Sequence, residues 1–366
     1  MLTDRERAWL RLHLTRGLGR TGLVRLMDTF GSPAAILDAG PGDWIRRAGI
    51  RDTVARSLPA DNDPSLLKTE EILNAAAVRI ISQWDGDHFP PLLRTLYDPP
   101  AILYLRGTLT AQPALAVVGA RRASPAGLQL TRELCKEIAS RGITIASGLA
   151  RGIDTAAHEG ALDAQGQTIA VLGCGIDRVY PPENRRLFQR IMEQGAILSE
   201  YPPGTPPLAG HFPGRNRIIS GLSQGALIVE AAEGSGSLIT ADFALEQGRE
   251  VFAVPGPVYA ETSSGVNRLL KEGAHLVTGA SDILEILWPG IPSKVAQEKE
   301  DSLQSELAGD ALALYRCLSI EPLHIDELAR KCGLTPMEVS AILLHLELQG
   351  GVEQLPGMRY IRCRRA

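Results

Sequence analysis

From residue 114 onward the chain alternates short apolar runs with longer stretches in which apolar positions recur at helical spacing. The apolar runs occupy residues 114–118, 144–146, 168–172, 196–198, 226–229, 250–254 and 275–277. Runs with few polar interruptions are typical of strands that are covered on both faces. We therefore expect an α/β domain over residues 114–290, with a mostly parallel sheet and helices on both sides.

The N-terminal part lacks this alternation. Residues 1–65 hold leucines at helical spacing, which predicts a small helical domain. The stretch RGLGRTGLVR at 16–25 resembles a helix-hairpin-helix or SAM-like element, in which glycine-turn amides can meet a phosphate; a helical cap that only packs is the favoured alternative. We interpret 66–113 as a connection, with a helix over 69–81 and a short strand over 102–105.

The C-terminal part follows a polar, charged stretch at 291–309, which we interpret as a linker. Residues 310–366 predict helices over 311–318, 324–332 and 336–348 and a hairpin over 352–363, the pattern of a winged helix. The third helix has no Lys or Arg, and only the end is basic, at Arg359, Arg362, Arg364 and Arg365. We expect this domain to contact another protein or to have a regulatory role, rather than to recognise a DNA sequence.

Composition narrows the possible partners. The net charge of −4 over 366 residues means that any nucleic-acid site must be a local patch. The five cysteines include no C-x-x-C pair, so we expect neither a disulfide framework nor a zinc site, and a reducing cytoplasm. The charged first twenty residues do not form a signal peptide, and no apolar run is long enough to span a membrane. We expect no metal and no cofactor.

Residues 211–241 combine the chain's most suggestive side chains. Phe212, Arg215, Asn216 and Arg217 are predicted to lie in a tight loop, close to the carboxyl end of the strand at 226–229. That strand is followed by Gly234-Ser-Gly-Ser237, which opens a helix where open α/β sheets bind ligands. Cations, an amide and a ring beside a helix N-terminus suit a ligand with phosphates and bases. Alternatively, both arginines pair with carboxylates such as Glu230.

Two other strand-end loops carry arginines. VGARRAS at 118–124 is not the G-x-G-x-x-G fingerprint, and Arg121 or Arg122 is interpreted as an anion clamp, with a solvent-exposed turn as the alternative. In SGLARGID at 147–154, Arg151 can face a phosphate. Asp154 and His158 on the following helix are interpreted as a structural pair rather than a catalytic or metal pair.

The loop after the strand at 168–172 offers a ring. Tyr180 presents a stacking face and Arg185 opens the next helix, although the tyrosine and its neighbouring prolines alternatively only make the loop rigid. Cys174 is interpreted as a small apolar filler rather than a nucleophile.

Together these motifs resemble the DNA-processing protein A family (DprA/Smf). The resemblance rests on VGARRAS at 118–124, SGLARGID at 147–154, GCGID at 173–177 with Tyr180-Pro181 and Asn184, FPGRNRII at 212–219 and GSGSLITA at 234–241. It implies that residues 114–290 form an extended Rossmann-like domain. It also implies a single-stranded-DNA-binding recombination mediator that loads the RecA recombinase in natural transformation, and a homodimer formed through the Rossmann-like domain.

The resemblance and the residues give one set of candidates. The expected DNA-binding residues are Gly119, Arg121, Arg122, Ser124, Arg151, Tyr180, Asn184, Arg185, Phe212, Arg215, Asn216, Arg217, Gly234, Ser235, Gly236 and Ser237. Whether Arg121 or Arg122 contacts phosphate stays open.

Two other classes of function compete with this hypothesis. Gly234-Ser-Gly-Ser237 with Glu246 and Arg249 resembles nucleotide phosphoribohydrolases of the lysine-decarboxylase-like class, in which a glutamate assists N-glycosidic cleavage. A transcription regulator that acts through the winged helix is the third possibility, although the acidic third helix argues against it.

Overall fold

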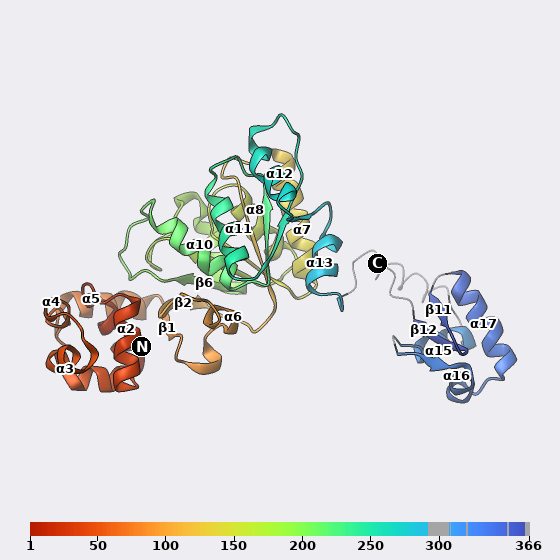
Figure 1. The fold of residues 1–366 in the computed structure, drawn as a ribbon, viewed down its shortest axis with the longest axis horizontal. Helices are drawn as coiled ribbons and strands as arrows, with labels where there is room; N and C mark the ends of the chain where they lie inside the picture. Colours follow the sequence, from red (N-terminus) through yellow and green to blue (C-terminus); the bar gives the residue numbers. More distant parts are fainter. Residues whose placement is uncertain (292–306, 308, 320, 350, 363–366) are drawn as a thin grey trace. The chain divides into compact units, whose positions relative to one another are not determined.

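The computed structural model describes residues 1–291, 307, 309–319, 321–349 and 351–362. The chain divides into two compact units, Met1–Gly279 and Ala280–Ala366, which are described separately (Figure 1). Most of the predicted linker at 291–309, and Arg364 and Arg365, lie outside the described residues.

The first unit is built on a nine-stranded sheet with the order β1-β2-β6-β5-β4-β3-β7-β8-β9. Its parallel strands are β3 (Ala114–Gly119), β4 (Thr144–Ser147), β5 (Thr168–Leu172), β6 (Ala196–Ser199), β7 (Gly225–Val229), β8 (Glu250–Ala253) and β9 (His275–Leu276). All seven coincide with predicted strands, and the Rossmann-like fold class is confirmed. The strand order reverses at the pair β3 and β7, which makes this pair the topological switch point of the sheet.

Helices cover both faces of this sheet. Along β5, Ala170 and Leu172 belong to one apolar cluster, and Ile169 and Val171 belong to another, as expected when side chains alternate between faces. The first cluster includes Leu187 of α9 (Arg185–Gln194), which packs beside α8 (Ile153–Asp163). The second includes α10 (His211–Gly221) and α11 (Gly236–Glu246).

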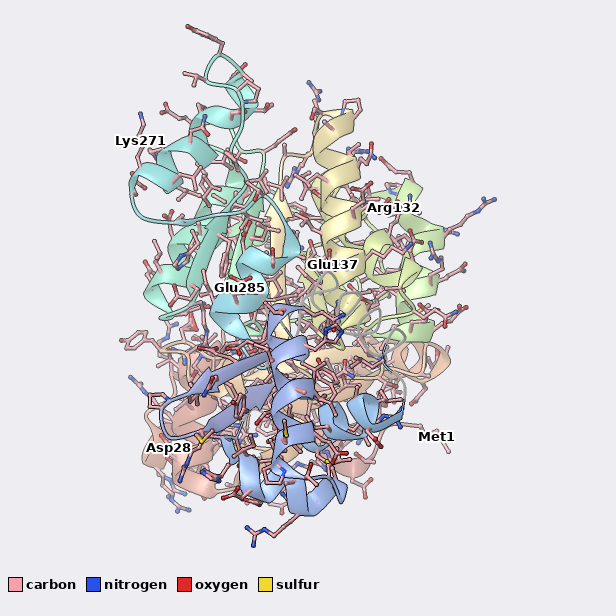
Figure 2. All side chains as sticks on the ribbon, turned by 90° about the vertical axis from the view of Figure 1, so that its right-hand side faces the viewer. Met1, Asp28, Arg132, Glu137, Lys271 and Glu285 are labelled. Carbon is pink, nitrogen blue, oxygen red and sulfur yellow. The ribbon has the colours of Figure 1, made fainter. Side chains whose placement is uncertain are left out.

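Helix α7 (Pro125–Ser140) shows how the helices separate apolar from polar positions. Leu134 and Ile138 are buried, whereas Arg132 and Glu137 lie on its outer side (Figure 2). Arg132 pairs there with Asp163 of α8 at 2.6 Å. The remaining helical segments of the Rossmann-like part are η1 (Gly86–His88), α6 (Pro91–Arg94), η2 (Pro182–Asn184), η3 (Glu261–Ser263) and α12 (Ser264–Lys271).

The segment interpreted as a connection contributes two strands to the sheet. β2 (Ile102–Gly107) pairs antiparallel with β6, and β1 (Arg79–Ser82) pairs antiparallel with β2. The helix predicted over 69–81 is wrong at its end, because α5 (Pro64–Ala75) stops before β1. The run from Val78 to Ile81 is too short for its period to distinguish a strand from a helix turn.

The N-terminal residues form the predicted helices. They are α1 (Asp4–His13), α2 (Arg20–Phe30), α3 (Pro33–Ala48), α4 (Asp52–Ala55) and α5. Trp9 and Trp44 are fully buried, in the same apolar cluster as Leu172 and Ile197 of the sheet. The helical part therefore shares a core with one face of the sheet, and a domain boundary near residue 65 stays a prediction.

The second unit contains the predicted winged helix. After α13 (Ala280–Leu287), it consists of α15 (Gly309–Cys317), α16 (Ile325–Cys332) and α17 (Pro336–Leu348) and a three-stranded sheet. The strands are β10 (Leu323–His324), β12 (Arg359–Arg362) and β11 (Val352–Leu355), in that order. A capping box between Thr335 and Glu338 fixes the start of α17.

Candidate nucleic-acid interface

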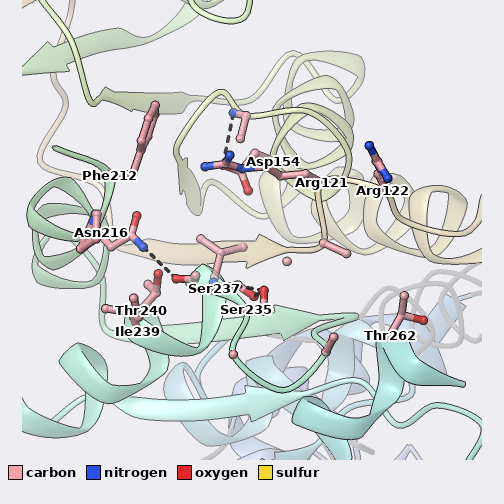
Figure 3. A pocket seen from close by; sticks show the side chains of 18 of the residues that line it. Arg121, Arg122, Asp154, Phe212, Asn216, Ser235, Ser237, Ile239, Thr240 and Thr262 are labelled. Atoms are coloured by element: carbon pink, nitrogen blue, oxygen red, sulfur yellow. Dashed lines mark hydrogen bonds between the residues drawn. The ribbon is translucent and has the colours of Figure 1, made fainter. Parts of the chain in front are cut away.

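A cavity of about 540 Å³ lies at the carboxyl ends of β3 and β7 (Figure 3). Gly119 ends β3 opposite Val229, and a Cβ at position 119 would meet the Val229 carbonyl oxygen, so only glycine lets the two strand ends approach this closely. The cavity thus lies at the topological switch point, the place where open α/β sheets bind their ligands.

One wall of the cavity comes from α10, and the tight loop predicted there is wrong. Arg215 and Asn216 follow Phe212 by three and four residues, so the three side chains lie on one face of the helix. All three line the cavity. Arg217 lies on another face. Its guanidinium donates to both carboxylate oxygens of Glu200 at 2.6 Å and to the Asp98 carbonyl at 2.7 Å. The structure therefore does not bring Arg217 to the cavity.

Arg215 is buried in the cavity wall. Its Nη1 donates to the Val171 carbonyl oxygen at 2.6 Å, and its guanidinium fills the space that a Cβ at Gly148 would need. Burial lowers the pKa of Arg215, and the nearby Asp154 carboxylate opposes that shift. Arg215 also lines the cavity, its Nε has no hydrogen-bond partner among the described residues, and its guanidinium lies 5.8 Å from the centre of the Phe212 ring.

Asp154 and His158 secure the strand-end loop that follows β4. Asp154 Oδ2 accepts from the backbone N–H groups of Gly148 at 3.2 Å and Ala150 at 3.3 Å. His158 Nε2 accepts from the Leu149 N–H at 3.3 Å, and Nδ1 donates to Thr168 Oγ1 at 2.7 Å, since that hydroxyl itself donates to the Ile145 carbonyl. Burial lowers the pKa of His158 to about 3, so its ring is neutral. The hydrogen bonds of both residues hold the loop in place, and Asp154 also lines the cavity.

Arg121, Phe212 and Tyr180 form a cationic and aromatic rim. The Arg121 guanidinium lies 5.1 Å from the centre of the Phe212 ring, and the Tyr180 ring lies 5.9 Å from Phe212. Arg121 is exposed and lines both the main cavity and a smaller hollow beside it, which Tyr180 and Arg151 also line. Arg151 pairs with Glu183 at the surface, and exposed Arg122 lines the main cavity.

The opposite wall is the start of α11. Ser235 caps the helix by accepting from the Ser237 N–H, and Asn216 donates to the Gly236 carbonyl at 3.0 Å. Gly234, with φ of 76°, makes the turn into the cap. The backbone N–H groups of the first turn are the kind of donor that phosphate accepts from. Figure 3 shows Ser235, Ser237 and Thr240 on this side, facing Arg121 and Phe212 across the cavity.

Three candidates besides Arg217 line neither the cavity nor the smaller hollow beside it. Ser124 caps α7 and donates its N–H to Glu230 at 2.8 Å, so that carboxylate holds a serine and not an arginine. Asn184 is buried and donates to the Leu149 carbonyl at 3.0 Å and to Thr155 at 2.9 Å. Arg185 is exposed at the start of α9, outside the cavity lining.

Sequence reasoning missed several lining residues. Thr240 is fully buried, its hydroxyl has no hydrogen-bond partner among the described residues, and it lines the cavity one helical turn after Ser237. That spacing from the glycine turn was a usable signal. Thr262 comes from the segment after β8, whose approach to the cavity depends on tertiary packing and has no local signature.

The enzyme-like constellation is not assembled. Gly234-Ser-Gly-Ser237 lies at the start of α11, whereas Glu246 is its last residue and is exposed. A helix of this length separates the two by roughly 15 Å. Among the residues that the structure describes, no three His, Cys, Asp or Glu side chains are grouped to hold a metal ion. None of the described helices is long and apolar enough to cross a membrane.

The fold and the cavity define a class: an open α/β protein whose switch-point pocket is lined by arginines, a ring and a helix N-terminus, groups that suit a phosphate-bearing ligand. Residues 79–288 match the family of DNA recombination-mediator protein A, and residues 298–358 match the DprA winged helix domain. The chain belongs to the DNA recombination-mediator protein A family, which confirms the resemblance found in its motifs.

Individual relatives agree with this assignment. Protein Smf of Escherichia coli is 46% identical over 288 residues, which are 77% of each chain. DNA processing protein DprA of Bacillus subtilis is 39% identical over 255 residues, 69% of this chain and 84% of the relative. The structure of DprA from Streptococcus pneumoniae covers 78% of this chain and 98% of its own at 36% identity, with a TM-score of 0.67. The structure of DprA from Helicobacter pylori covers 58% of this chain and 100% of its own at 32% identity, with a TM-score of 0.52.

Proposed function

We propose that this protein binds single-stranded DNA in the switch-point cavity and acts without catalysing a reaction. The observation that carries the proposal is the convergence of Arg121, the Phe212 ring and the N-terminus of α11 on one cavity of about 540 Å³. Cations and amides suit the phosphates of a flexible backbone, and a ring suits an unpaired base. The Helicobacter pylori relative is described by its single-stranded-DNA binding mode, which supports the same ligand here.

The proposed contacts differ in kind. Arg121 and Arg122 are exposed and meet phosphates from one side, while the first amides of α11 meet a phosphate from the other. Phe212 and Tyr180 offer base-stacking faces, each worth roughly 1–3 kcal/mol. Arg215 is buried in the cavity wall beside the Phe212 ring, where it adds positive charge to the wall.

The binding experiment is a titration of fluorescent oligo-dT across a salt series. Each phosphate neutralised on a single strand contributes about 0.7 to the slope of log affinity against log salt. Arg121→Ala should therefore weaken binding and lower the magnitude of the slope by about 0.7.

The matched control is Arg185→Ala, which removes another exposed arginine, one that lies outside the cavity lining. Its affinity and slope should match those of the unmodified protein. Equal losses in both variants would point to general surface charge instead of this cavity, and an unchanged Arg121→Ala slope would contradict the phosphate contact.

We infer further that the bound strand is handed to the RecA recombinase in the cytoplasm during natural transformation, with the protein acting as a homodimer through its Rossmann-like unit. Membership of a recombination-mediator family supports this role. The test is RecA filament formation on oligo-dT coated with single-stranded-DNA-binding protein. Filaments should form faster with this protein than without it, and Arg121→Ala should abolish the gain.

A further inference from the structure

Helix α17 of the winged helix has two apolar faces. Val339, Leu343 and Leu346 are buried in the core of the domain. A second stripe points away from that core, with exposures of 84% at Met337, 59% at Leu344 and 80% at Leu348. Exposed Ala341 completes this stripe, which we call the outer seam: Met337, Ala341, Leu344 and Leu348.

The outer seam has the spacing of a coiled-coil interface. Its members are separated by four, three and four residues, the alternation that places one stripe against a partner helix. At 100° per residue they lie within one narrow sector, opposite the sector of the buried residues. An exposed stripe of this length on a 13-residue helix is a docking face and not scattered surface exposure.

The charges beside the outer seam exclude a nucleic-acid backbone as its occupant. Helix α17 has no Lys or Arg, and Glu338 and Glu347 flank the seam on opposite sides. A DNA backbone would meet carboxylates where it needs cations. The alternation of four and three residues along the seam instead fits a protein helix as its partner.

The flanks are complementary to a second copy of the same helix. In an antiparallel pair centred between Ala341 and Leu344, Met337 packs opposite the second copy's Leu348, and Ala341 packs opposite Leu344. The same arrangement places Glu338 opposite His345 on one flank and Ser340 opposite Glu347 on the other, twice each. We propose that α17 pairs antiparallel with α17 of another copy of this protein.

The pairing is weak by itself and takes effect when two copies are already close. Four apolar residues per helix bury less than the roughly 1,200 Å² of a stable standard interface. Two copies on one DNA strand, or in one dimer, raise the effective concentration enough for the seam to close. The outer seam is separate from the switch-point cavity, so either proposal can fail alone.

Cross-linking between two full-length variants tests both the pairing and its direction. One chain carries Met337→Cys and the other Leu348→Cys, and a short bis-maleimide is added. The mixture should give at least five times more linked dimer than either variant alone, each corrected for the background of the native cysteines. Equal linking within the separate variants, or no linking above background, overturns the antiparallel pair.

A second pair of variants tests whether the outer seam is responsible for the mixed cross-link. Leu344→Glu added to both cysteine chains should reduce the mixed cross-link at least tenfold. Met358→Glu, which adds the same charge at an exposed position of the adjacent hairpin, should leave it unchanged. Circular dichroism checks folding, and affinity for an oligo-dT too short to hold two copies should be the same in all variants. Protection of Met337→Cys from maleimide by duplex DNA would assign the seam to DNA and overturn the proposal.

Discussion

At the scale of single residues, two arginines beside one ring have different tasks. Arg121 is exposed and lies 5.1 Å from the Phe212 ring centre, whereas Arg215, at 5.8 Å, is buried beside Asp154. An exposed guanidinium can exchange water for phosphate at little cost, whereas a buried one is already committed to its internal partners. Substitutions at the two positions should therefore separate binding from stability.

Arg215→Ala should reduce the free energy of unfolding by about 1–3 kcal/mol, because it removes a buried side chain that donates to the Val171 carbonyl oxygen and takes a positive charge from near Asp154. Arg121→Ala should change it by less than about 0.5 kcal/mol, as for most surface substitutions. Urea unfolding measures both. A stable Arg215→Ala protein that fails to bind oligo-dT would instead make Arg215 a direct ligand contact.

His158 and His13 should make the fold sensitive to acid. Burial lowers the pKa of His158 to about 3 and that of His13 to about 4, below the usual 6.5. As the pH falls below 6.5, the unfolded chain takes up protons that the folded chain refuses, so stability is lost on the acid side. Each histidine should remove about 1.4 kcal/mol between pH 7.5 and 5.5.

Urea unfolding of the unmodified protein and of His158→Gln at both pH values measures the histidine contribution. The variant should be less stable at pH 7.5 but should lose about 1.4 kcal/mol less on acidification. Identical pH dependence in the two proteins would show that His158 is not held neutral.

At the scale of elements, the cavity depends on how closely β3 and β7 meet and on where α10 begins. The two strands pair from Leu115 with Gly225 to Gly119 with Val229, so their last residues are level at the cavity. Helix α10 then presents every third or fourth residue to the cavity.

Gly119→Ala should disturb the closest of these contacts. A Cβ there would overlap the Val229 carbonyl oxygen, so the strands must shift, at about 1–3 kcal/mol in unfolding free energy and with a loss of oligo-dT affinity. Gly42→Ala, in α3, is the matched control, because a Cβ at that position has open space and the residue lies outside the cavity lining. Thermal unfolding and oligo-dT titration of both variants show whether the close contact at Gly119 is what the cavity needs. If so, only Gly119→Ala should lose stability and affinity.

The sequence predicted the parallel strands well because each buried run is continuous and is bounded by turn residues. It failed at α10, where Pro213 and Gly214 suggested a loop, although proline is tolerated in a first helical turn. That error grouped Arg217 with Arg215 and Asn216, which helical periodicity separates. The pairing of β2 with β6 was equally hidden, since strand partners distant in sequence leave no local signal.

At the scale of the whole molecule, a chain with a net charge of −4 presents a cationic rim at one place on its first unit. The second unit shows no comparable feature on α17, whose exposed seam is apolar between two glutamates. We expect the DNA-binding and docking tasks to be divided between the two units.

A chain that ends after residue 291 should bind oligo-dT within about twofold of the full-length affinity, because the lining of the cavity belongs to the first unit. Fluorescence anisotropy at fixed salt measures the ratio. A loss of tenfold or more would assign a direct DNA contact to the winged helix, in conflict with the acidic flanks of α17.

Position 148 must be glycine as long as position 215 is arginine. Because the guanidinium occupies the volume where any β-carbon at 148 would stand, a residue other than glycine at 148 requires that Arg215 has also been replaced. A lineage that exchanged the arginine for a shorter residue could accept a larger neighbour at 148, and one that keeps it cannot. In related sequences, a residue larger than glycine at position 148 should therefore occur only where position 215 is no longer arginine.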